Sequence, residues 1–515
     1  MPAAPQAARA VLSQPLPDPT ATVRYTPGDC ALLVGPAEIL LKALEAVRLA
    51  GLRPALLCTD FPDPDGLPRG LRAVSGELAE ARGWMGAFRA TTGGKAGALD
   101  LAPLSFHADG HFDWVLDFTG ARRAAPPPGY HTLPAGDFAA LKAALLKIAG
   151  QLRQGHEKPR YFSLDDNLCA HRRQEIPGCS TCLAVCPAGA INGGKESVHI
   201  EPHLCLGCGT CALVCPGGAA RHVHPGTARQ IGRLDVALTA WRQAGGGPVG
   251  IWIGAEAAPA DWLPFALASP ASLGLEFWLA ALMAGANRVA VATGRMEPET
   301  RQALAAQIEL GKALLAGLGL PVALGLAESA DELEGLPTLP EAMPLPPPAG
   351  EDKRRLLFAT LDALLARARP ETVALGLPAG APLGEVRIAA DRCTVCCACA
   401  RICPTQALTL PGSGQIAFRE ENCTQCGLCR NVCPEKAVAL EPRLLVSAAA
   451  RRAPRVLAQA DLFPCAGCGI PFVPRALIER SRALMVDHPM FQGDQARLMT
   501  LCPDCRQKAM AGVPT

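Results

Sequence analysis

The segments DRCTVCCACARICP, residues 391–404, and ENCTQCGLCRNVCP, residues 421–434, contain five and four cysteines. Both follow the spacing C-x2-C-x2-C-x3-C-P once Cys397 is set aside. If Cys397 replaced Cys396, the gaps around it would become three and one residues, so we interpret Cys397 as outside the pattern. The sequence favours a small buried thiol that fills space over a redox-sensing thiol at this position.

This spacing is a bacterial iron–sulfur signature, in which three thiolates of a run bind one [4Fe-4S] cluster and the fourth, beside the proline, binds the other cluster. Two runs in tandem resemble a two-[4Fe-4S] ferredoxin module. The rule assigns one cluster to Cys393, Cys396, Cys399 and Cys433, and the other to Cys423, Cys426, Cys429 and Cys403.

An earlier copy of the module departs from this pattern. Its second run is intact, but its first run has Ile176 where the first cysteine is expected. Cys169 lies ten residues before Cys179 and can loop back to complete the site. We therefore predict one cluster on Cys169, Cys179, Cys182 and Cys215, and another on Cys205, Cys208, Cys211 and Cys186. A three-iron cluster, or His171 in place of Cys169, is the alternative.

The C-terminal segments PCAGCGIPF and LCPDCRQ place two C-x2-C pairs near the end of the chain. Two such knuckles on hairpin turns supply four sulfurs in the tetrahedral arrangement that structural Zn²⁺ prefers. The predicted ligands are Cys465, Cys468, Cys502 and Cys505. A rubredoxin-like single iron uses the same ligands and is the alternative, while a metal-free pair of redox thiols fits less well.

Composition limits the classes of function. The chain has 515 residues, 23 cysteines, 49 basic and 47 acidic residues, and a formal net charge of +2. Charges form no long blocks, so we expect no nucleic-acid partner, and no stretch is apolar enough to predict a membrane span. The N-terminal residues do not resemble an export signal, so many cysteines indicate metal binding in a reducing cytoplasm.

Outside the cysteine-rich segments, short apolar runs alternate with amphipathic helical patterns, which predicts parallel-sheet α/β domains. We expect a multidomain α/β plus α+β protein, with two ferredoxin-like modules and a C-terminal zinc-ribbon-like knuckle. The expected parts are a flexible tail (1–27), a Rossmann-like α/β domain (28–155), a first ferredoxin module (156–225), a second α/β domain (226–336), a Pro-rich linker and helix (337–386), a second ferredoxin module (387–445) and a four-cysteine metal-binding domain (446–515).

No catalytic motif emerges from the sequence. Neither α/β segment has G-x-G-x-x-G after its first strand, and GAINGGKES (189–197) has Glu196 where a phosphate-binding loop needs Ser or Thr, which predicts a hairpin turn. We interpret His107, His111, Asp113 and Asp117 as solvated polar residues. The sequence thus predicts no catalytic residue and no catalytic activity of the chain's own.

The segments EKPRYFSLDDNLCAH, GCSTCLAVCPAGAI, LCLGCGTCALVCPGGA and ASLGLEFWLAALMAGANRVAVA together resemble the large multi-cluster 4Fe-4S ferredoxin-type proteins of proteobacteria, which are often encoded beside formate dehydrogenase components. The resemblance implies electron transfer through four [4Fe-4S] clusters, with redox protein partners that include formate dehydrogenase. Two alternatives remain: a maturation or docking scaffold for a molybdenum dehydrogenase, and an enzyme subunit with a cofactor bound in an α/β domain.

Overall fold

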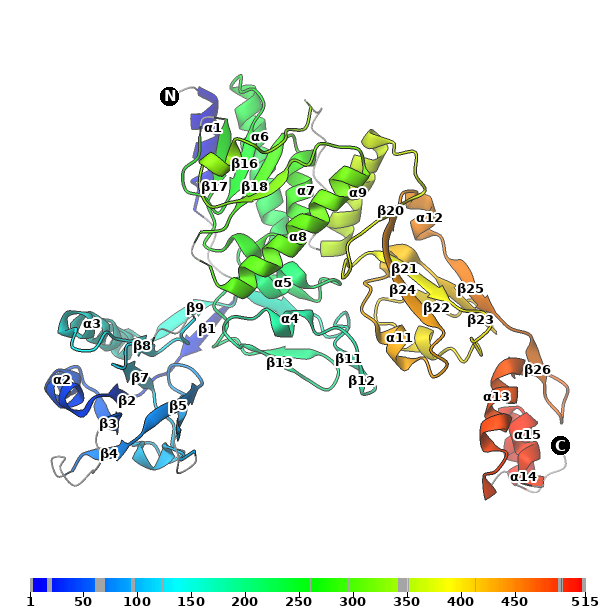
Figure 1. The fold of residues 1–515 in the computed structure, drawn as a ribbon, viewed down its shortest axis with the longest axis horizontal. Coiled ribbons are helices and arrows are strands. Elements are labelled where there is room, and N and C mark those ends of the chain that lie inside the picture. Colours follow the sequence, from blue (N-terminus) through cyan, green and yellow to red (C-terminus); the bar gives the residue numbers. More distant parts are fainter. Residues whose placement is uncertain are drawn as a thin grey trace.

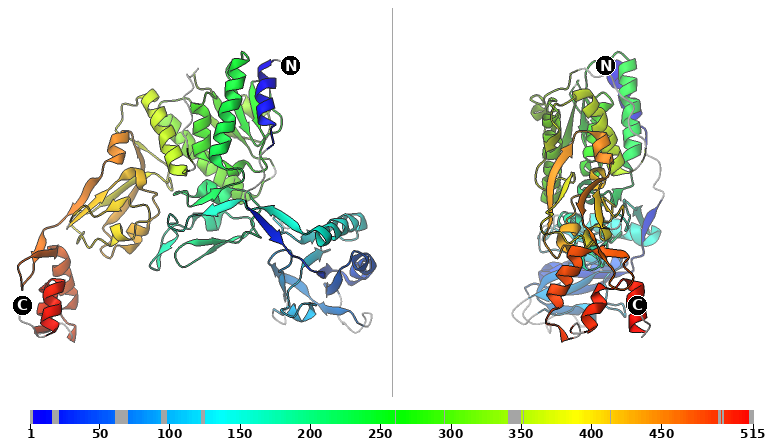
Figure 2. Two further views of the ribbon diagram at one scale, coloured as in Figure 1. Left: turned by 180° about the vertical axis from the view of Figure 1, so that it is seen from behind. Right: turned by 90° about the vertical axis from the view of Figure 1, so that its right-hand side faces the viewer.

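The computed structural model describes residues 3–15, 21–60, 70–93, 98–121, 125–259, 261–294, 296–340, 350, 352–412, 414–489, 492 and 494–511. Two parallel sheets, two cysteine-rich modules and a helical C-terminal segment form the chain (Figure 1). The first sheet and the C-terminal helices lie at opposite ends of the molecule, with the second sheet and the modules between them (Figures 1 and 2). The mixed architecture with parallel sheets is the one predicted.

The first parallel sheet has the strand order β4-β3-β2-β7-β8. Its strands are β2 (Cys30–Gly35), β3 (Arg53–Cys58), β4 (Arg72–Ser75), β7 (Trp114–Asp117) and β8 (Tyr130–Thr132). Every neighbouring pair is parallel. All six residues of β2 are buried, as expected for a central strand that is covered on both faces.

Different structures cover the two faces of this sheet. Helices α2 (Ala37–Leu49) and α3 (Phe138–Gln154) pack against one face through a shared apolar core. On the other face, the hairpin of β5 (Glu77–Arg82) and β6 (Arg89–Gly93) and the turn η2 (Ala102–Leu104) contribute to a second core. In the described residues both helices thus lie on one face, which differs from a doubly wound Rossmann-like fold.

The second parallel sheet has the order β17-β16-β18-β19. Its strands are β16 (Gly250–Ile253), β17 (Trp262–Phe265), β18 (Arg288–Ala292) and β19 (Leu324–Ala327), and its neighbouring strands are parallel. Helices α6 (Thr227–Gln243), α7 (Leu275–Met283) and α8 (Pro298–Gly317) join it in the largest apolar core. Every residue of α7 is buried, which explains why its sequence is apolar on all sides.

The N-terminal segment differs from the expected flexible tail. Residues Ala3–Leu12 form α1, which packs against α6 because its small side chains Ala4 and Ala8 allow close approach. Strand β1 (Thr22–Tyr25) then pairs with β9 (His156–Pro159) in an antiparallel ribbon. This ribbon leads from the first sheet to the first cysteine-rich module (Figure 1).

The segment expected to hold a Pro-rich linker and a helix contains α9 (Lys353–Ala368), which has a different role from that of a linker. This helix packs against α7 and buries Leu356, Leu361 and Leu364 in the largest core. It is therefore part of the central body. The Pro-rich residues 341–349 lie outside the described residues.

The first module consists of short antiparallel pairs around its cysteines. Strand β10 (Phe162–Leu164) pairs with β15 (Ala220–His222), and β13 (Ile191–Gly193) pairs with β14 (Val198–Ile200). The β13–β14 pair confirms the hairpin predicted for residues 189–197. A further small hairpin, β11 (Arg172–Arg173) with β12 (Ile176–Pro177), and the short helices α4 (Thr181–Ala184) and α5 (Thr210–Val214) complete the module.

The second module repeats this plan and extends beyond its expected boundaries. Strand β21 (Gly384–Ile388) pairs with β24 (Val438–Leu445), β22 (Leu408–Thr409) pairs with β23 (Gln415–Phe418), and the short helices are α10 (Ala398–Arg401) and α11 (Leu428–Val432). Strands β20 (Ala374–Gly376) and β25 (Arg455–Gln459) join these sheets from outside the expected range 387–445.

The C-terminal segment contains the hairpin of β26 (Leu462–Pro464) and β27 (Pro471–Pro474), followed by α13 (Arg475–Met485), α14 (Asp494–Arg497) and α15 (Pro503–Met510). It lies apart from the central body in Figure 1 and in the left view of Figure 2. Across the described part of the chain, no helix has both the length and the apolar character that a bilayer crossing requires.

Candidate iron–sulfur and metal sites

The thiols of the two modules gather in four groups. Site 1 comprises Cys186, Cys205, Cys208 and Cys211; site 2 comprises Cys169, Cys179, Cys182 and Cys215; site 3 comprises Cys403, Cys423, Cys426 and Cys429; site 4 comprises Cys393, Cys396, Cys399 and Cys433. In each site, burial first and then the charges of the other three cysteines raise the pKa of one thiol, namely Cys211, Cys182, Cys429 and Cys399. The structure therefore brings together the predicted groups, and cluster ligation by them remains a prediction.

The raised pKa values of these thiols indicate that each site requires a compensating positive charge. The pKa of Cys182 and that of Cys399 each rise to about 12, because burial and neighbouring thiolates both disfavour the charged form. Four buried thiols that face one another cannot all ionise unless a cation compensates them. Iron binds thiolates, so a bound cluster would supply the missing positive charge.

A shared turn positions the first cysteine of each run. The peptide N–H groups of Cys169, Cys205 and Cys393 each donate to the carbonyl oxygen four residues earlier, with N···O distances of 3.1, 3.1 and 3.0 Å. The amide of Cys423 donates to the carbonyl three residues earlier, at 3.0 Å. Cys169 thus occupies the same local structure as the first cysteines of the regular runs.

The β11–β12 hairpin explains the irregular spacing of site 2. The amide of Cys179 donates to the carbonyl oxygen of Ala170 at 2.8 Å, so the chain between them loops out and returns. Gln174 and Glu175 form the tip with φ of 47° and 65°. Cys169 and Cys179 therefore lie close in space although ten positions separate them.

A cavity in the first module is lined by all four thiols of site 2. Leu168, Val198 and Pro216 provide apolar walls, and Thr424 from the second module lies at its edge. His171 also lines the cavity, but its Nδ1 hydrogen-bonds to the carbonyl oxygen of Cys179 at 3.0 Å, and a Cβ atom on Gly193 would meet its Nε2 at 2.9 Å. Both ring nitrogens thus face backbone, which favours Cys169 over His171 as the fourth ligand.

In three of the four cysteine runs, the residue directly after the second cysteine has a left-handed conformation, whereas Ser180 in the first run has φ of −126°. Gly209 has φ of 77° and Gly427 has φ of 85°, and Cys397 occupies the equivalent position with φ of 66°. At Gly209 an added Cβ atom would also lie 2.4 Å from the Cα atom of Ser272. Cys397 therefore takes the left-handed position that glycine occupies in the second run of each module.

The contacts of the Cys397 side chain do not suit a cluster ligand. Its thiol donates to the carbonyl oxygen of Val395 at 3.2 Å, and burial raises the pKa of this thiol. A thiol with a raised pKa is less reactive than an ordinary one. Both observations support the interpretation of Cys397 as a non-ligand and disfavour a redox-sensing role.

Backbone N–H groups point at several sulfurs. The cysteines beside the prolines accept such bonds from an amide four or five residues later: Ala190 to Cys186, Ala220 to Cys215, and Ala437 to Cys433, with N···S distances of 3.3 to 3.4 Å. Hydrogen bonds of this kind stabilise negative sulfur and tune the potential of a bound cluster. The donor set therefore fits thiolate-ligated iron.

The two modules meet between site 2 and site 3. The side-chain amide of Asn431 donates to the carbonyl oxygen of Pro177 at 2.7 Å, and helix α11 packs against β12. Leu428 is buried at this junction with Ala170 and Ile402. The Cys179 thiol also contributes to the raised pKa of Cys426, which shows that the two sites are neighbours.

Arg354, in the first turn of α9, joins the modules at a position that the sequence analysis missed. Its guanidinium donates to the carbonyl oxygens of Pro216 at 3.2 Å and of Cys423 at 2.9 Å, next to a ligand of site 2 and at a ligand of site 3. It also donates to Pro382 and Glu421. Burial lowers the pKa of Arg354 to about 10, so the side chain remains charged at neutral pH.

The C-terminal pairs also converge. Single ligand atoms of Cys465, Cys468, Cys502 and Cys505 all lie within 4.8 Å of one another. The sulfurs of Cys468 and Cys502 are 3.8 Å apart. Two sulfurs bound tetrahedrally to one zinc at about 2.3 Å would be separated by about 3.8 Å, so the spacing fits this metal.

The second pair departs from the expected zinc ribbon. Cys465 and Cys468 lie on the β26–β27 hairpin as predicted, whereas Cys502 caps the N-terminus of α15 and Cys505 lies in its first turn. The amides of Cys502 and Gly467 donate to the Cys465 sulfur at 3.1 and 3.4 Å. Burial raises the pKa of Cys465, but these N–H groups outweigh it and lower the pKa to about 6, which favours a thiolate ligand.

The interpretation of four polar residues as solvated is wrong for two of them. Asp113 and Asp117 are 1% and 3% exposed. Asp117 accepts hydrogen bonds from Thr119 and Tyr130, and Asp113 from the amide of Cys30. The two aspartates lie at opposite ends of β7, so burial of this strand also buries its ends.

One comparison with known proteins bears on these sites. A family model described as a 4Fe-4S dicluster domain matches the chain twice, over residues 176–219 and 392–437. The first match begins after Cys169, in agreement with the irregular run. No curated protein matches the chain. The two matches support a multi-cluster ferredoxin-type protein that binds 4Fe-4S clusters and transfers electrons.

Proposed function

We propose that this protein is an electron relay with four [4Fe-4S] clusters in the order site 1, site 2, site 3, site 4. The contact between site 2 and site 3 is the observation that carries the proposal, because it joins two dicluster modules into one path. Separate modules would carry electrons only within pairs of clusters. The first module would then not exchange electrons with the second.

Electrostatic influence between thiols of different sites supports this order. Beyond the thiols of its own site, Cys211 in site 1 is influenced by Cys182 in site 2, Cys426 in site 3 by Cys179 in site 2, and Cys429 in site 3 by Cys399 in site 4. Each of these neighbours raises the pKa of the thiol that it faces. The links connect the four sites in a single line.

Bound [4Fe-4S] clusters supply one-electron redox chemistry, and the protein's residues provide position and environment. Apolar residues pack around the cysteines of both modules. At the junction, the charged Arg354 favours added negative charge on the neighbouring sites, and Lys353 fixes α9 to the first module through the carbonyl oxygens of Ala212 and Leu213 at 2.6 and 2.7 Å.

Site 1, at one end of the proposed line of sites, lies beside the β1–β9 ribbon. At site 1, the ammonium group of Lys158 on β9 donates to the carbonyl oxygen of Cys205 at 2.7 Å, and the hydroxyl of Tyr25 on β1 donates to His203 at 2.5 Å. The β1–β9 ribbon therefore connects the first sheet to this site. We propose redox proteins as partners in a reducing, cytoplasmic setting, with formate dehydrogenase as the partner implied by the family resemblance.

A second candidate function is a ligand-binding enzyme subunit. A cavity of about 70 Å³ lies between the first module and the carboxyl end of the second sheet, where α/β sheets bind ligands, and it is lined by the buried side chain of Glu276 together with Ser272, His222 and Lys353. Ligand pockets usually measure about 300 Å³ or more, so a flavin or nicotinamide does not fit. The relay is the better supported function.

Iron and acid-labile sulfide analysis of anaerobically purified protein, with EPR after dithionite reduction, tests the proposal. We expect about sixteen irons per chain and the broadened spectra of magnetically coupled [4Fe-4S] clusters. Far fewer irons, or reduced clusters without coupling, would contradict a four-cluster line. Reduction by formate in the presence of a formate dehydrogenase tests the partner separately.

A further inference from the structure

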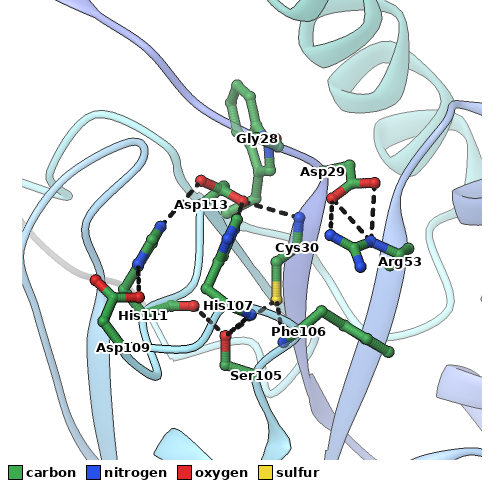
Figure 3. Close-up of polar contacts among 11 residues, drawn as sticks. Gly28, Asp29, Cys30, Arg53, Ser105, Phe106, His107, Asp109, His111 and Asp113 are labelled. Atoms are coloured by element: carbon green, nitrogen blue, oxygen red, sulfur yellow. Dashed lines mark hydrogen bonds and ion pairs between the residues drawn. The ribbon is translucent and has the colours of Figure 1, made fainter.

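A cluster of two histidines and one aspartate lies at the amino end of the first sheet, outside the cysteine-rich modules. His107 and His111 belong to the loop between η2 and β7, and Asp113 immediately precedes β7 (Figure 3). The aspartate side chain is 1% exposed, and the histidines are 26% and 21% exposed. Two half-buried imidazoles thus surround a buried carboxylate.

The three side chains have the spacing of ligands to one ion. Nε2 of His107 lies 2.7 Å from Oδ2 of Asp113, and Nε2 of His111 lies 3.6 Å from Oδ1. Single ligand atoms of the three residues lie within 4.8 Å of one another. Ligand atoms on a tetrahedral zinc, at about 2.0–2.1 Å from the metal, are separated by about 3.3 Å, which falls between the two measured distances.

Hydrogen bonds around the cluster orient its members. Nδ1 of His111 is 2.5 Å from Oδ1 of Asp109, as in the carboxylate–histidine pairs that support metal ligands, and this leaves Nε2 directed at Asp113. The amide of Cys30, at the start of β2, donates to Oδ2 of Asp113 at 2.9 Å. The amide of His107 donates to the hydroxyl oxygen of Ser105 at 3.0 Å. Figure 3 shows both imidazoles beside the same carboxylate.

Gly28 leaves room for this arrangement. A Cβ atom at position 28 would lie 2.9 Å from Oδ2 of Asp113 and 3.2 Å from the His107 ring. The two imidazole rings are stacked, with centroids 3.9 Å apart. Imidazole binds metal through a neutral ring nitrogen, so a bound ion would hold both rings in their neutral form.

We propose that His107, His111 and Asp113 bind a divalent transition metal ion, with Zn²⁺ as the preferred occupant. Two imidazoles and one carboxylate form a zinc ligand set that leaves a coordination position for water. The metal takes the place of the proton that His107 shares with Asp113, and the His107 ring then carries its proton on Nδ1. The partly exposed histidines give the ion a route from solvent.

The site would fasten the covering loop to the sheet. Asp113 joins β7 to β2 through Cys30, while His107 and His111 belong to the loop that lies over the face covered by the β5–β6 hairpin. A bound ion would therefore link this loop to two central strands. The proposal is independent of the relay, because none of its residues belongs to a module.

Metal analysis of the full chain, expressed with zinc and desalted, tests the proposal. We expect about two zinc ions per chain, one from the C-terminal cysteines and one from the new site. His111→Gln and His107→Gln should each lose one zinc while iron and sulfide remain unchanged. His199→Gln, at an exposed position on β14, is the matched control and should lose none.

Zinc K-edge EXAFS of the wild-type protein keeps the test decisive if the variants fail to fold. A zinc at the new site should add nitrogen or oxygen ligands and the outer-shell scattering of imidazole to a sulfur signal. A sulfur-only spectrum would overturn the proposal. Equal zinc contents in wild type and in well-folded His111→Gln would overturn it as well.

Discussion

The two cysteine-rich modules build the same pair of sites in different ways. The second module uses regular spacing throughout and places Cys397 where the loop needs a left-handed residue. The first module has Ser180, with φ of −126°, at the equivalent position, interrupts its first run with the β11–β12 hairpin and uses Cys169 from before that hairpin. The comparison teaches that the turn before a cysteine, more than its spacing, places it in a site.

The most severe test of this comparison is Cys169→Ser. If the hairpin is an insertion into a normal run, this variant should lose at least one iron at site 2 and form a three-iron cluster or none. An oxidised protein with a [3Fe-4S] signal in EPR, or about four fewer irons by metal analysis, is the expected result. Cys397→Ser provides the matched control and should keep its full iron content.

The next test concerns the bridge that joins the modules. Arg354→Met leaves four carbonyl oxygens without their donor, and we expect a loss of several kcal/mol in stability, since each buried acceptor left unsatisfied costs about 1–3 kcal/mol. Without the positive charge, the potentials of sites 2 and 3 should fall. Calorimetry and an anaerobic redox titration measure these effects.

Arg355→Met is the control for this prediction, because Arg355 is the exposed neighbour on the same helix. It should change stability by less than about 0.5 kcal/mol, as for other surface substitutions. If Arg354→Met and Arg355→Met change stability and cluster potentials equally, the Arg354 guanidinium does not join the modules.

A smaller loss is expected for Leu428→Ala at the contact between site 2 and site 3. Leu428 is 1% exposed, and its truncation should cost about 2–4 kcal/mol through the cavity that it leaves. Alanine is compatible with the ligand loop, since Ala398 occupies the equivalent position in the run of site 4. The spin coupling between sites 2 and 3 should weaken in EPR while the iron content is retained.

The smallest effect is a gain. Cys397→Gly should raise stability by about 1 kcal/mol, because glycine removes the cost of a left-handed cysteine. Cys397→Ala retains the Cβ atom and should show no such gain. Thermal unfolding under argon compares the two variants, and an equal response would show that the thiol matters more than the backbone.

Much of this organisation could be predicted from local sequence. Short apolar runs predicted the strands of the α/β domains, and helical periodicity predicted their helices and the helix after the Pro-rich linker, since both signals depend on neighbouring residues. The predicted ligand groups followed from the cysteine spacing and from the rule that the cysteine beside the proline binds the other cluster. A matching turn, with an acidic residue four positions before Cys169 and Cys205, was an available signal for the irregular run.

The rest depended on tertiary contacts. Nothing adjacent to Arg354 indicates that its guanidinium reaches carbonyl groups in both modules, more than a hundred positions away in one case. The burial of Asp113 and the pairing of the two histidines with it likewise result from how a loop folds over the first sheet. The order of the four sites also required the contact between modules.

An iron anomalous difference map from anaerobically grown crystals tests the central claim most directly. The relay predicts four separate iron peaks in a line, centred in sites 1, 2, 3 and 4, with a peak between Cys169 and Cys215. The absence of iron at site 2, or a large gap between the peaks of sites 2 and 3, would contradict a continuous path.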